Sequence, residues 1–342
     1  KTIAQARAAM LVDPATARTK AALAERQSAA IADPVSRGIV RATTLWLQGE
    51  AAYRLHDFDS AMPRLREALA LVRAHAPGSK LEADVLVSRG SLQAESLQVV
   101  AALSDFQRAH AIALRLNDSR IRAIALICIA SLYRDAKDFD AALRYLDQAL
   151  ATFSGDPGLR LSIENNRAAV LKELGRHAEA ERGFRAALEI ARTLHSPVLE
   201  QQILRNIARS QLKRNDVVSA ERTIAQSEAT VGQADDYSRQ AILNVAAQAA
   251  MQQGRLAAAA ELIGRGFAGV DPATTSLTYR DAHATAFQVF HRLGRNDQAF
   301  VHLRALKRLD DETTRLATTT GAALMAARFD FANQELRIAR LK

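Results

Sequence analysis

Side chains that commonly carry chemistry are scattered in this sequence. It contains eight histidines, and none forms the four-residue pair with an intervening acid that binds zinc in proteases. His291 and His302 fall on successive expected helices and could approach one another, although a solvent-facing or hydrogen-bonded histidine is the commoner outcome. Cys128 is the only cysteine and lies among aliphatic residues, where a buried, inert thiol is expected.

Motifs for a chemical step are also missing. The sequence has no glycine-rich phosphate loop, no serine nucleophile elbow and no clustered pair of carboxylates. It therefore predicts no enzyme activity, no metal site and no cofactor. Any function should then come from a binding surface, and the elements that would form such a surface follow from composition and periodicity.

Composition predicts a nearly all-helical protein. The 342 residues are 49% hydrophobic but only 5% aromatic, with 15 glycines and 7 prolines, too few turn-forming residues for a many-stranded protein. No segment is apolar for long enough to span a membrane. The net charge is +9, but basic and acidic residues alternate along the chain as on solvated helix faces. We therefore expect no nucleic-acid partner.

An internal repeat of about 40 residues dominates the sequence. A small residue is followed four positions later by Leu, Ile or Phe, and this pattern recurs seven times. The first residues of the seven matches are Ala61, Ala102, Ala142, Ala180, Ala220, Ala259 and Ala299. A short break precedes each match, as at 55–58 and 174–177, where a residue in the left-handed conformation would end one helix before the next begins. Each unit is therefore predicted to be helix, tight turn, helix.

The repeat resembles the tetratricopeptide repeat (TPR) family. Matches to its signature in two of the units are Trp46, Gly49, Tyr53, Ala61, Leu65, Ala68, Ala130, Tyr133, Phe139, Ala142, Leu146 and Ala149. The resemblance implies an all-α, right-handed superhelical solenoid, with seven repeats over 41–310 and a degenerate N-terminal repeat or cap over 1–40. Another α-hairpin solenoid outside the family is the alternative, and it has the same fold physics.

Residues 311–342 do not follow the repeat and predict a long C-terminal helix, with a bend near Gly321. Its apolar stripe contains Leu324, Phe331, Ile338 and Leu341. One interpretation is a helix that caps the last repeat. The other is a coiled-coil seam that pairs two copies in a homodimer.

Residues 326–341 and 42–51 are similar to segments of bacterial membrane-anchored sensors. In those proteins, a periplasmic TPR domain precedes a transmembrane helix and a GGDEF diguanylate cyclase or histidine kinase domain. This resemblance implies a non-enzymatic, periplasmic sensor module in signal transduction, with the output domain outside this chain. The alternative is a free-standing scaffold or adaptor for protein–protein interaction, with a cytoplasmic location.

The TPR resemblance also implies which residues line the concave groove, because fixed positions of each first helix face inward. Carried onto this sequence, these positions include Trp46, Glu50, Arg134, Asn165, Lys172, Arg205, Arg209, Asn244, Gln248 and His291. Amide and guanidinium groups suit a protein or peptide partner or a small anionic ligand. The pattern departs from the family's carboxylate clamp, since Arg209 and Val245 replace expected asparagines. A solvated inner face without a ligand is the alternative.

Overall fold

In the computed structural model, every regular element of the described residues is helical, which confirms the all-α prediction. The structure describes residues 2–10, 13–153, 155–229 and 236–340, and the side chains among them except those of 236–239 and 328–340. The elements are α1 (Thr2–Ala9), α2 (Pro14–Ser28), α3 (Pro34–Arg54), α4 (Phe58–His75), α5 (Lys80–Glu95), α6 (Val99–Leu116), α7 (Ser119–Asp135), α8 (Phe139–Thr152), α9 (Pro157–Glu173), α10 (His177–Thr193), α11 (Pro197–Lys213), α12 (Val217–Ala229), α13 (Asp236–Gln252), α14 (Leu256–Gly266), the 3₁₀ helices η2 (Pro272–Thr274) and η3 (Leu277–Tyr279), α15 (Arg280–Arg292) and α16 (Asn296–Arg340).

The tight turns have the geometry that the sequence predicts. One residue in each takes a positive φ, and these residues are His56, Leu97, Lys137, Gly175, Asn215, Gly254 and Gly294. The next helix then begins at once. After His56, for example, the Asp57 side chain accepts a hydrogen bond from the Ser60 backbone N–H at 3.2 Å and caps α4. The left-handed residue reverses the chain, and the cap fixes where the second helix starts.

Small residues let the two helices of a hairpin approach closely, as the repeat pattern predicts. A Cβ atom on Gly49 of α3 would lie 2.8 Å from the Leu65 side chain of α4. On Gly90 of α5, it would lie 2.5 Å from the ring of Phe106 in α6. Both bulky partners are fully buried. The contact between a small and a large residue therefore sets the spacing between the helices.

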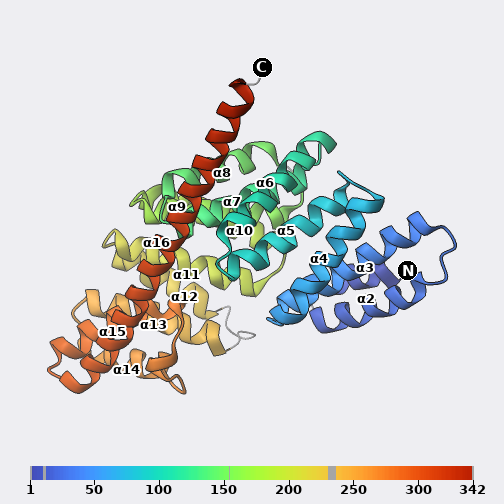
Figure 1. Cartoon of the computed structure of the whole chain (residues 1–342). Helices are drawn as coiled ribbons and strands as arrows, with labels where there is room; N and C mark the ends of the chain where they lie inside the picture. The colour runs from blue at the N-terminus through green and yellow to red at the C-terminus, as the bar shows by residue number, and fades with distance from the viewer. Residues whose placement is uncertain (1, 11–12, 154, 230–235, 341–342) are drawn as a thin grey trace. The chain divides into compact units, whose positions relative to one another are not determined.

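The chain divides into two compact units, and each is described by itself. Unit 1 contains residues 1–135, 151–153 and 319–342. Its helices α3–α6 follow one another side by side in Figure 1. Its largest core cluster includes Leu69, Val72, Leu86, Ile112 and Ile121. The unit is thus a stack of hairpins in which each helix pair buries apolar residues against its neighbours.

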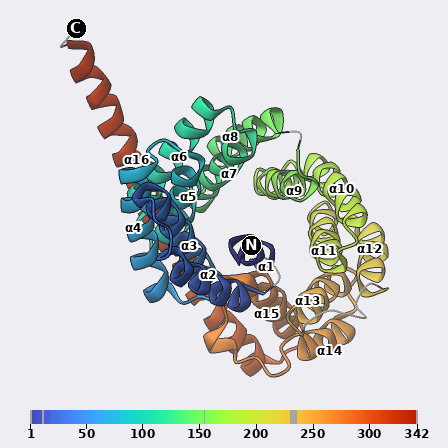
Figure 2. The same ribbon diagram turned by 90° about the vertical axis from the view of Figure 1, so that its right-hand side faces the viewer.

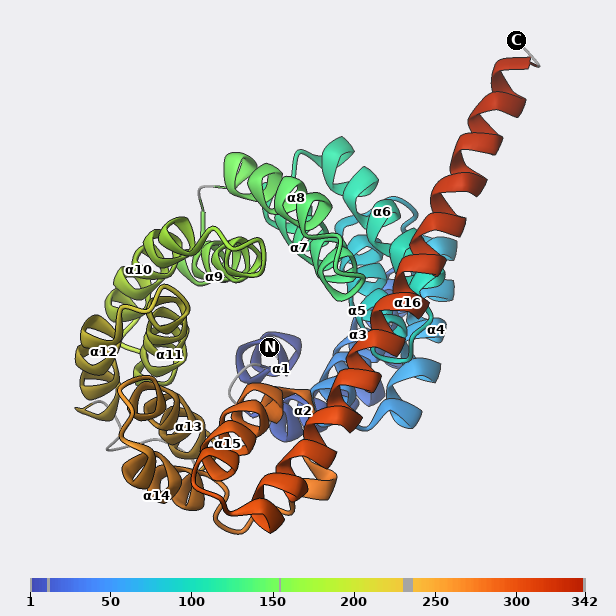
Figure 3. The same ribbon diagram turned by 90° about the vertical axis from the view of Figure 1, so that its left-hand side faces the viewer.

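Unit 2 contains residues 136–150 and 154–318. Its hairpins α9/α10, α11/α12 and α13/α14 stack in order, and α15 packs against α13 and α14. Figures 2 and 3 show α9, α11 and α13 on the concave side of the curve of this unit, with α10, α12 and α14 outside. We call the exposed side of α9, α11, α13 and α15 the inner face.

The connection between α14 and α15 departs from the simple repeat. Because α14 ends at Gly266 and α15 begins at Arg280, residues 267–279 form a long linker that contains η2 and η3. The spacing of 40 residues from Ala259 to Ala299 does not reveal this insertion, because the shorter α14 and α15 compensate for the longer linker.

The C-terminal helix α16 is continuous from Asn296 to Arg340, so the bend expected near Gly321 is wrong. The helix runs through residues 310–312 without a break, as the absence of proline and of other glycines predicts. Leu324 is buried, with 3% of its surface exposed. The other stripe residues, Phe331, Ile338 and Leu341, lie outside the described side chains. No helix in the described ranges is both long and apolar enough to cross a bilayer.

Candidate functional site

Three of the ten predicted groove residues line one cavity on the inner face of unit 2. Arg205 and Arg209 project from α11, and Asn244 projects from α13. The cavity has a volume of about 210 Å³. We call it the arginine pocket, and its lining residues are Arg205, Arg209, Ala241, Asn244, Thr278, Tyr279 and Ala282. Helix periodicity brings the arginines together, because residues four apart share one helix face.

The described lining of the arginine pocket carries positive charge. Neither an aspartate nor a glutamate is among its lining residues. Within the described residues, Arg209 forms no ion pair, and its side chain is half-buried. A guanidinium held in a small cavity attracts anions more strongly than one extended into solvent, because fewer waters screen it.

Asn244 is fixed beneath the cavity by close contact with α14. It is 8% exposed, and its buried Oδ1 has no hydrogen-bond partner among the described atoms. A Cβ atom on Gly266 would lie 2.6 Å from this oxygen. Gly266 therefore makes the room for the carboxamide, because a larger residue there would meet its oxygen.

The linker supplies the opposite wall of the pocket. The Tyr279 hydroxyl donates a hydrogen bond to Oε1 of Gln240 at 2.9 Å, and Nε2 of Gln240 donates to the Ala268 carbonyl at 3.1 Å. The Tyr279 ring also packs against Phe267, with ring centroids 5.7 Å apart. These contacts hold the wall in place without a ligand. The groove positions did not predict Thr278 or Tyr279, because both lie in the linker.

Other predicted residues of unit 2 lie on the same helices but outside the pocket. Oδ1 of Asn165 accepts a hydrogen bond from Nδ2 of Asn206 at 3.3 Å, which joins α9 to α11. Lys172 is paired with Glu173 at 3.0 Å. Gln248 is half-buried on α13. The inner face is therefore polar along its length, and the arginine pocket brings three of the predicted residues into one cavity.

The predicted groove residues of unit 1 already have partners within that unit. The indole N–H of Trp46 donates to Oγ of Ser88 at 2.8 Å. Glu50 is paired with Arg54 at 2.8 Å. Arg134 is paired with Asp135 at 3.1 Å. These contacts give Trp46 and Glu50 clear packing roles, and no described cavity gathers the three residues.

His291 does not approach His302, and its exposure is the outcome that the sequence favoured. His291 is exposed on α15, where it stacks on Phe287 with ring centroids 5.8 Å apart. His302 of α16 instead pairs with His283 of α15, with a distance of 2.8 Å between the two Nδ1 atoms. Residues 283 and 291 are more than two turns apart along α15, so only one of them can lie level with His302, and that residue is His283.

The histidine pair is buried and neutral. Nε2 of His283 lies 2.9 Å from Oγ1 of Thr275, and that hydroxyl donates to the Pro272 carbonyl at 3.0 Å. The hydroxyl has one proton, so Nε2 of His283 must donate to it and Nδ1 must accept from His302. Burial lowers the pKa of His302 to about 4, and burial together with the charge of His302 and Arg308 lowers the pKa of His283 to about 4.

Two further features of the described residues bear on chemistry. Cys128 is half-buried rather than fully buried, and desolvation raises the pKa of its thiol to about 12, so the thiol is protonated at neutral pH. No group of three or more His, Cys, Asp or Glu side chains in the described ranges is placed to hold a metal ion.

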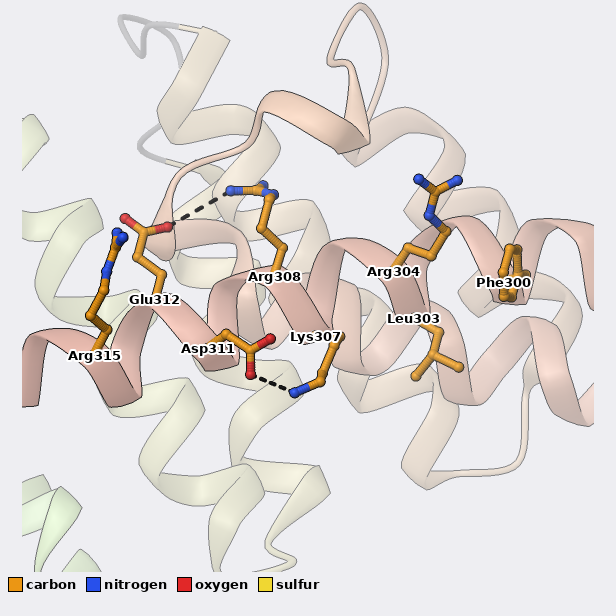
Figure 4. Close-up of a pocket in the computed structure, with 8 residues that line it drawn as sticks. All are labelled: Phe300, Leu303, Arg304, Lys307, Arg308, Asp311, Glu312 and Arg315. Carbon is orange, nitrogen blue, oxygen red and sulfur yellow. Dashed lines mark hydrogen bonds and ion pairs between the residues drawn. The ribbon is translucent and has the colours of Figure 1, made fainter. Parts of the chain in front are cut away.

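A larger depression, of about 870 Å³, lies along α16, but its lining comes from this helix alone (Figure 4). Lys307 pairs with Asp311 at 2.5 Å, and Arg308 pairs with Glu312 at 3.8 Å. Phe300 is 59% exposed at one end. Two of its four basic residues are paired with acids, and one helix forms its whole lining, so this surface is a weaker candidate than the arginine pocket.

Comparisons with known proteins agree with this architecture. The tetratricopeptide repeat family model matches residues 122–153 and 161–198. A search of curated protein sequences finds no match.

Solved structures similar to this chain share its fold at low sequence identity. The apo form of the quorum sensor NprR from B. thuringiensis has a TM-score of 0.68 at 10% identity, covering 90% of this chain and 86% of its own. A Rap protein complexed with competence and sporulation factor has a TM-score of 0.65 at 14% identity, covering 92% and 86%. The Pseudomonas aeruginosa protein pilF has a TM-score of 0.52 at 19% identity, covering 74% and 99%. The chain therefore contains two segments that match the tetratricopeptide repeat model, and it shares the TPR-like solenoid fold of these structures.

Proposed function

We propose that this chain is a non-enzymatic protein-interaction module that binds a segment of a partner protein along the inner face of unit 2. The observation that carries the proposal is the grouping of Arg205, Arg209 and Asn244 around one cavity on that face. Side chains of this kind hydrogen-bond to peptide backbones and carboxylates, and they are held by a rigid stack of helices.

The structural neighbours support the same class of function. The Rap structure was solved with competence and sporulation factor bound, and NprR is described as a quorum sensor. By analogy of fold, the TPR-like hairpins of this chain would present a ligand-binding face in the same way. This analogy favours a binding protein and says nothing about the identity of its ligand.

Site-specific crosslinking tests the proposal. Peptides selected from a random library against the full chain would be crosslinked to a photoreactive residue placed either at Gln248, on the inner face, or at Arg265, which is exposed on the outer helix α14. We expect most independent peptides to crosslink at Gln248. Crosslinking mainly at Arg265, or equally at both positions, would contradict the proposal.

A narrower proposal places the chain in a periplasmic, membrane-anchored sensor with a GGDEF or histidine kinase output. Its support is the continuous helix α16, which could transmit a signal or pair two copies. The adaptor form has more support, because the three neighbours described above are not proteins of that kind. Light scattering tests the sensor form, since a homodimer that is lost when residues 311–342 are removed is expected only if α16 mediates association.

A further inference from the structure

We infer that a cavity in unit 1 binds a phosphate monoester group carried on an apolar carbon body. The cavity lies between α6 and the turn that joins α4 to α5, and we call it the α6 pocket. Its lining residues are Pro77, Gly78, Glu82, Arg108, Ala111, Ile112 and Arg115. The inference goes beyond the proposed function, because this described lining contains none of the ten predicted groove residues and no part of unit 2.

The α6 side of the pocket is a stripe of residues on successive helical turns. Arg108, Ala111, Ile112 and Arg115 are spaced by three and four residues, so their side chains share one face of the helix. Ala111 is the small residue between the two arginines, and its methyl group leaves room on this face for a bound group. The pocket therefore has a guanidinium group at each end of the stripe.

Arg115 has an unpaired charge in the described part of the chain. Its side chain is exposed and forms no ion pair or hydrogen bond with the described residues. The guanidinium lies against the turn, because a Cβ atom on Gly78 would lie 2.6 Å from Nη2 of Arg115. Gly78 also has a φ of +70°, which favours glycine. The turn thus accommodates the guanidinium without neutralising it.

A buried carboxylate orients Arg108. Glu82 is fully buried, and its Oε1 lies 2.9 Å from Nη2 of Arg108 and 3.3 Å from Nε of Arg73. Its Oε2 accepts a hydrogen bond from the Gly78 backbone N–H at 2.7 Å. Burial alone would raise the pKa of Glu82, but these donors and the arginine charges lower the pKa below its ordinary value. With Arg115, three guanidinium groups face one carboxylate, so the surroundings of the pocket keep an excess of positive charge.

The repeat does not require arginine at either position. Arg108 and Arg115 follow Ala102, the first residue of the second match, and the corresponding residues of the first match are Glu67 and Ala74. None of the other six matches has arginine at both positions of its sequence. Packing between hairpins therefore does not explain the pair, and a bound anion does.

A phosphate monoester fits both the charge and the lining. Near neutral pH it carries about two negative charges and three strong acceptor oxygens, which two guanidinium groups can bind through paired hydrogen bonds. Pro77, Ala111 and Ile112 add apolar surface that suits the carbon body of the ester. The volume of about 500 Å³ lies within the roughly 300–1,000 Å³ typical of small-molecule sites, so the pocket has room for more than the phosphate group.

NMR titration of the full chain with two matched anions tests the inference. The backbone amide resonances of Gly78 and Ile112 would be followed in the ¹⁵N-labelled protein during addition of phenyl phosphate or phenyl sulfate at constant ionic strength. At about pH 8 the phosphate ester is a dianion, since its second pKa is about 6, whereas the sulfate ester of the same shape is a monoanion. We expect saturable shifts with phenyl phosphate at a dissociation constant on the order of 1 mM, as charge-assisted hydrogen bonds from two arginines would give. Phenyl sulfate should bind about tenfold more weakly, because it carries half the charge.

Two substitutions and one control assign the binding to the pocket. Arg115→Gln should weaken phenyl phosphate binding about tenfold, as expected for loss of a charged donor, and leave the unfolding midpoint unchanged, because this side chain is exposed and unpaired among the described residues. Ala111→Glu should abolish binding, because the new carboxylate would pair with Arg115 four residues later. The matched control Arg66→Gln replaces an exposed arginine of α4 outside the pocket lining and should leave the affinity unchanged.

Three results would overturn the inference: equal binding of phenyl sulfate, equal or tighter binding of inorganic phosphate, or an unchanged affinity in the Arg115→Gln protein. N-acetylphosphoserine methylamide distinguishes the source of the ester. Tighter binding than phenyl phosphate would indicate a phosphorylated protein segment, weaker binding would indicate a small organic phosphate, and both orders support the pocket. Crosslinking of library peptides at Gln248 tests only the inner face of unit 2, so the proposed function and this inference fail independently.

Discussion

Lowering the pH should destabilise this protein through the His283–His302 pair. Both imidazoles have a pKa of about 4 in the folded chain, against an ordinary value of 6.5. As the pH falls below 6.5, these two histidines become protonated in the unfolded chain but stay neutral in the folded chain. The free energy of unfolding therefore decreases between pH 6.5 and pH 4. With these two pKa values, the free energy of unfolding should fall by about 2 kcal/mol for each imidazole between pH 7 and pH 5.

Urea unfolding followed by circular dichroism measures this loss. The comparison is with the double substitution His283→Leu and His302→Leu. This removes both imidazoles from their contacts with the rings of Phe267 and Phe290 and leaves apolar side chains in their place. Other titrating groups are common to both proteins and cancel. We expect the natural protein to lose up to about 4 kcal/mol more than the double variant from pH 7 to pH 5. Equal losses in the two proteins would refute the buried neutral pair, as would an imidazole pKa near 6 in a direct NMR titration.

Three other substitutions test the packing described above. Gly90→Ala should destabilise unit 1 by about 1–3 kcal/mol in thermal unfolding, because the new methyl group meets the ring of Phe106 at 2.5 Å; an unchanged midpoint would show that the two helices can separate freely. Gly266→Ala should displace the Asn244 carboxamide into the arginine pocket and weaken the binding of a selected peptide about tenfold, whereas a retained dissociation constant would place that peptide elsewhere. Glu82→Gln should lower unfolding stability by about 1–3 kcal/mol, because this fully buried carboxylate accepts hydrogen bonds from two arginines and a backbone N–H; a loss within experimental error would mean that those donors are satisfied by water.

The repeat could be predicted from sequence because its causes are local. A left-handed turn residue such as His56 and a small residue such as Gly49 opposite Leu65 follow from backbone sterics and helical spacing. The same spacing placed Arg205 and Arg209 on one helix face, and the TPR resemblance added Asn244, so three of the seven lining residues of the pocket were accessible from sequence.

The remaining residues of the pocket lining depend on tertiary contacts that local sequence rules do not reveal. Tyr279 reaches the pocket only because the linker folds back on α13 through Gln240, and the unchanged spacing of the repeat hides that linker. His283 was not singled out because its partner lies on the next helix, and the choice between His283 and His291 depends on the rotation of α15. A proline-containing segment after a short helix, at Pro272, was the one sequence signal for the insertion.

The most direct test of the central claim is the affinity of one library-selected peptide for three forms of the full chain. Fluorescence anisotropy would give the dissociation constants for the natural protein, for Arg209→Gln and for Arg265→Gln at two salt concentrations. If the inner face of unit 2 is the binding surface, Arg209→Gln should weaken binding about tenfold and reduce its salt dependence, while Arg265→Gln should behave as the natural protein. Equal affinities for all three proteins, or a larger loss in Arg265→Gln, would show that the partner binds elsewhere.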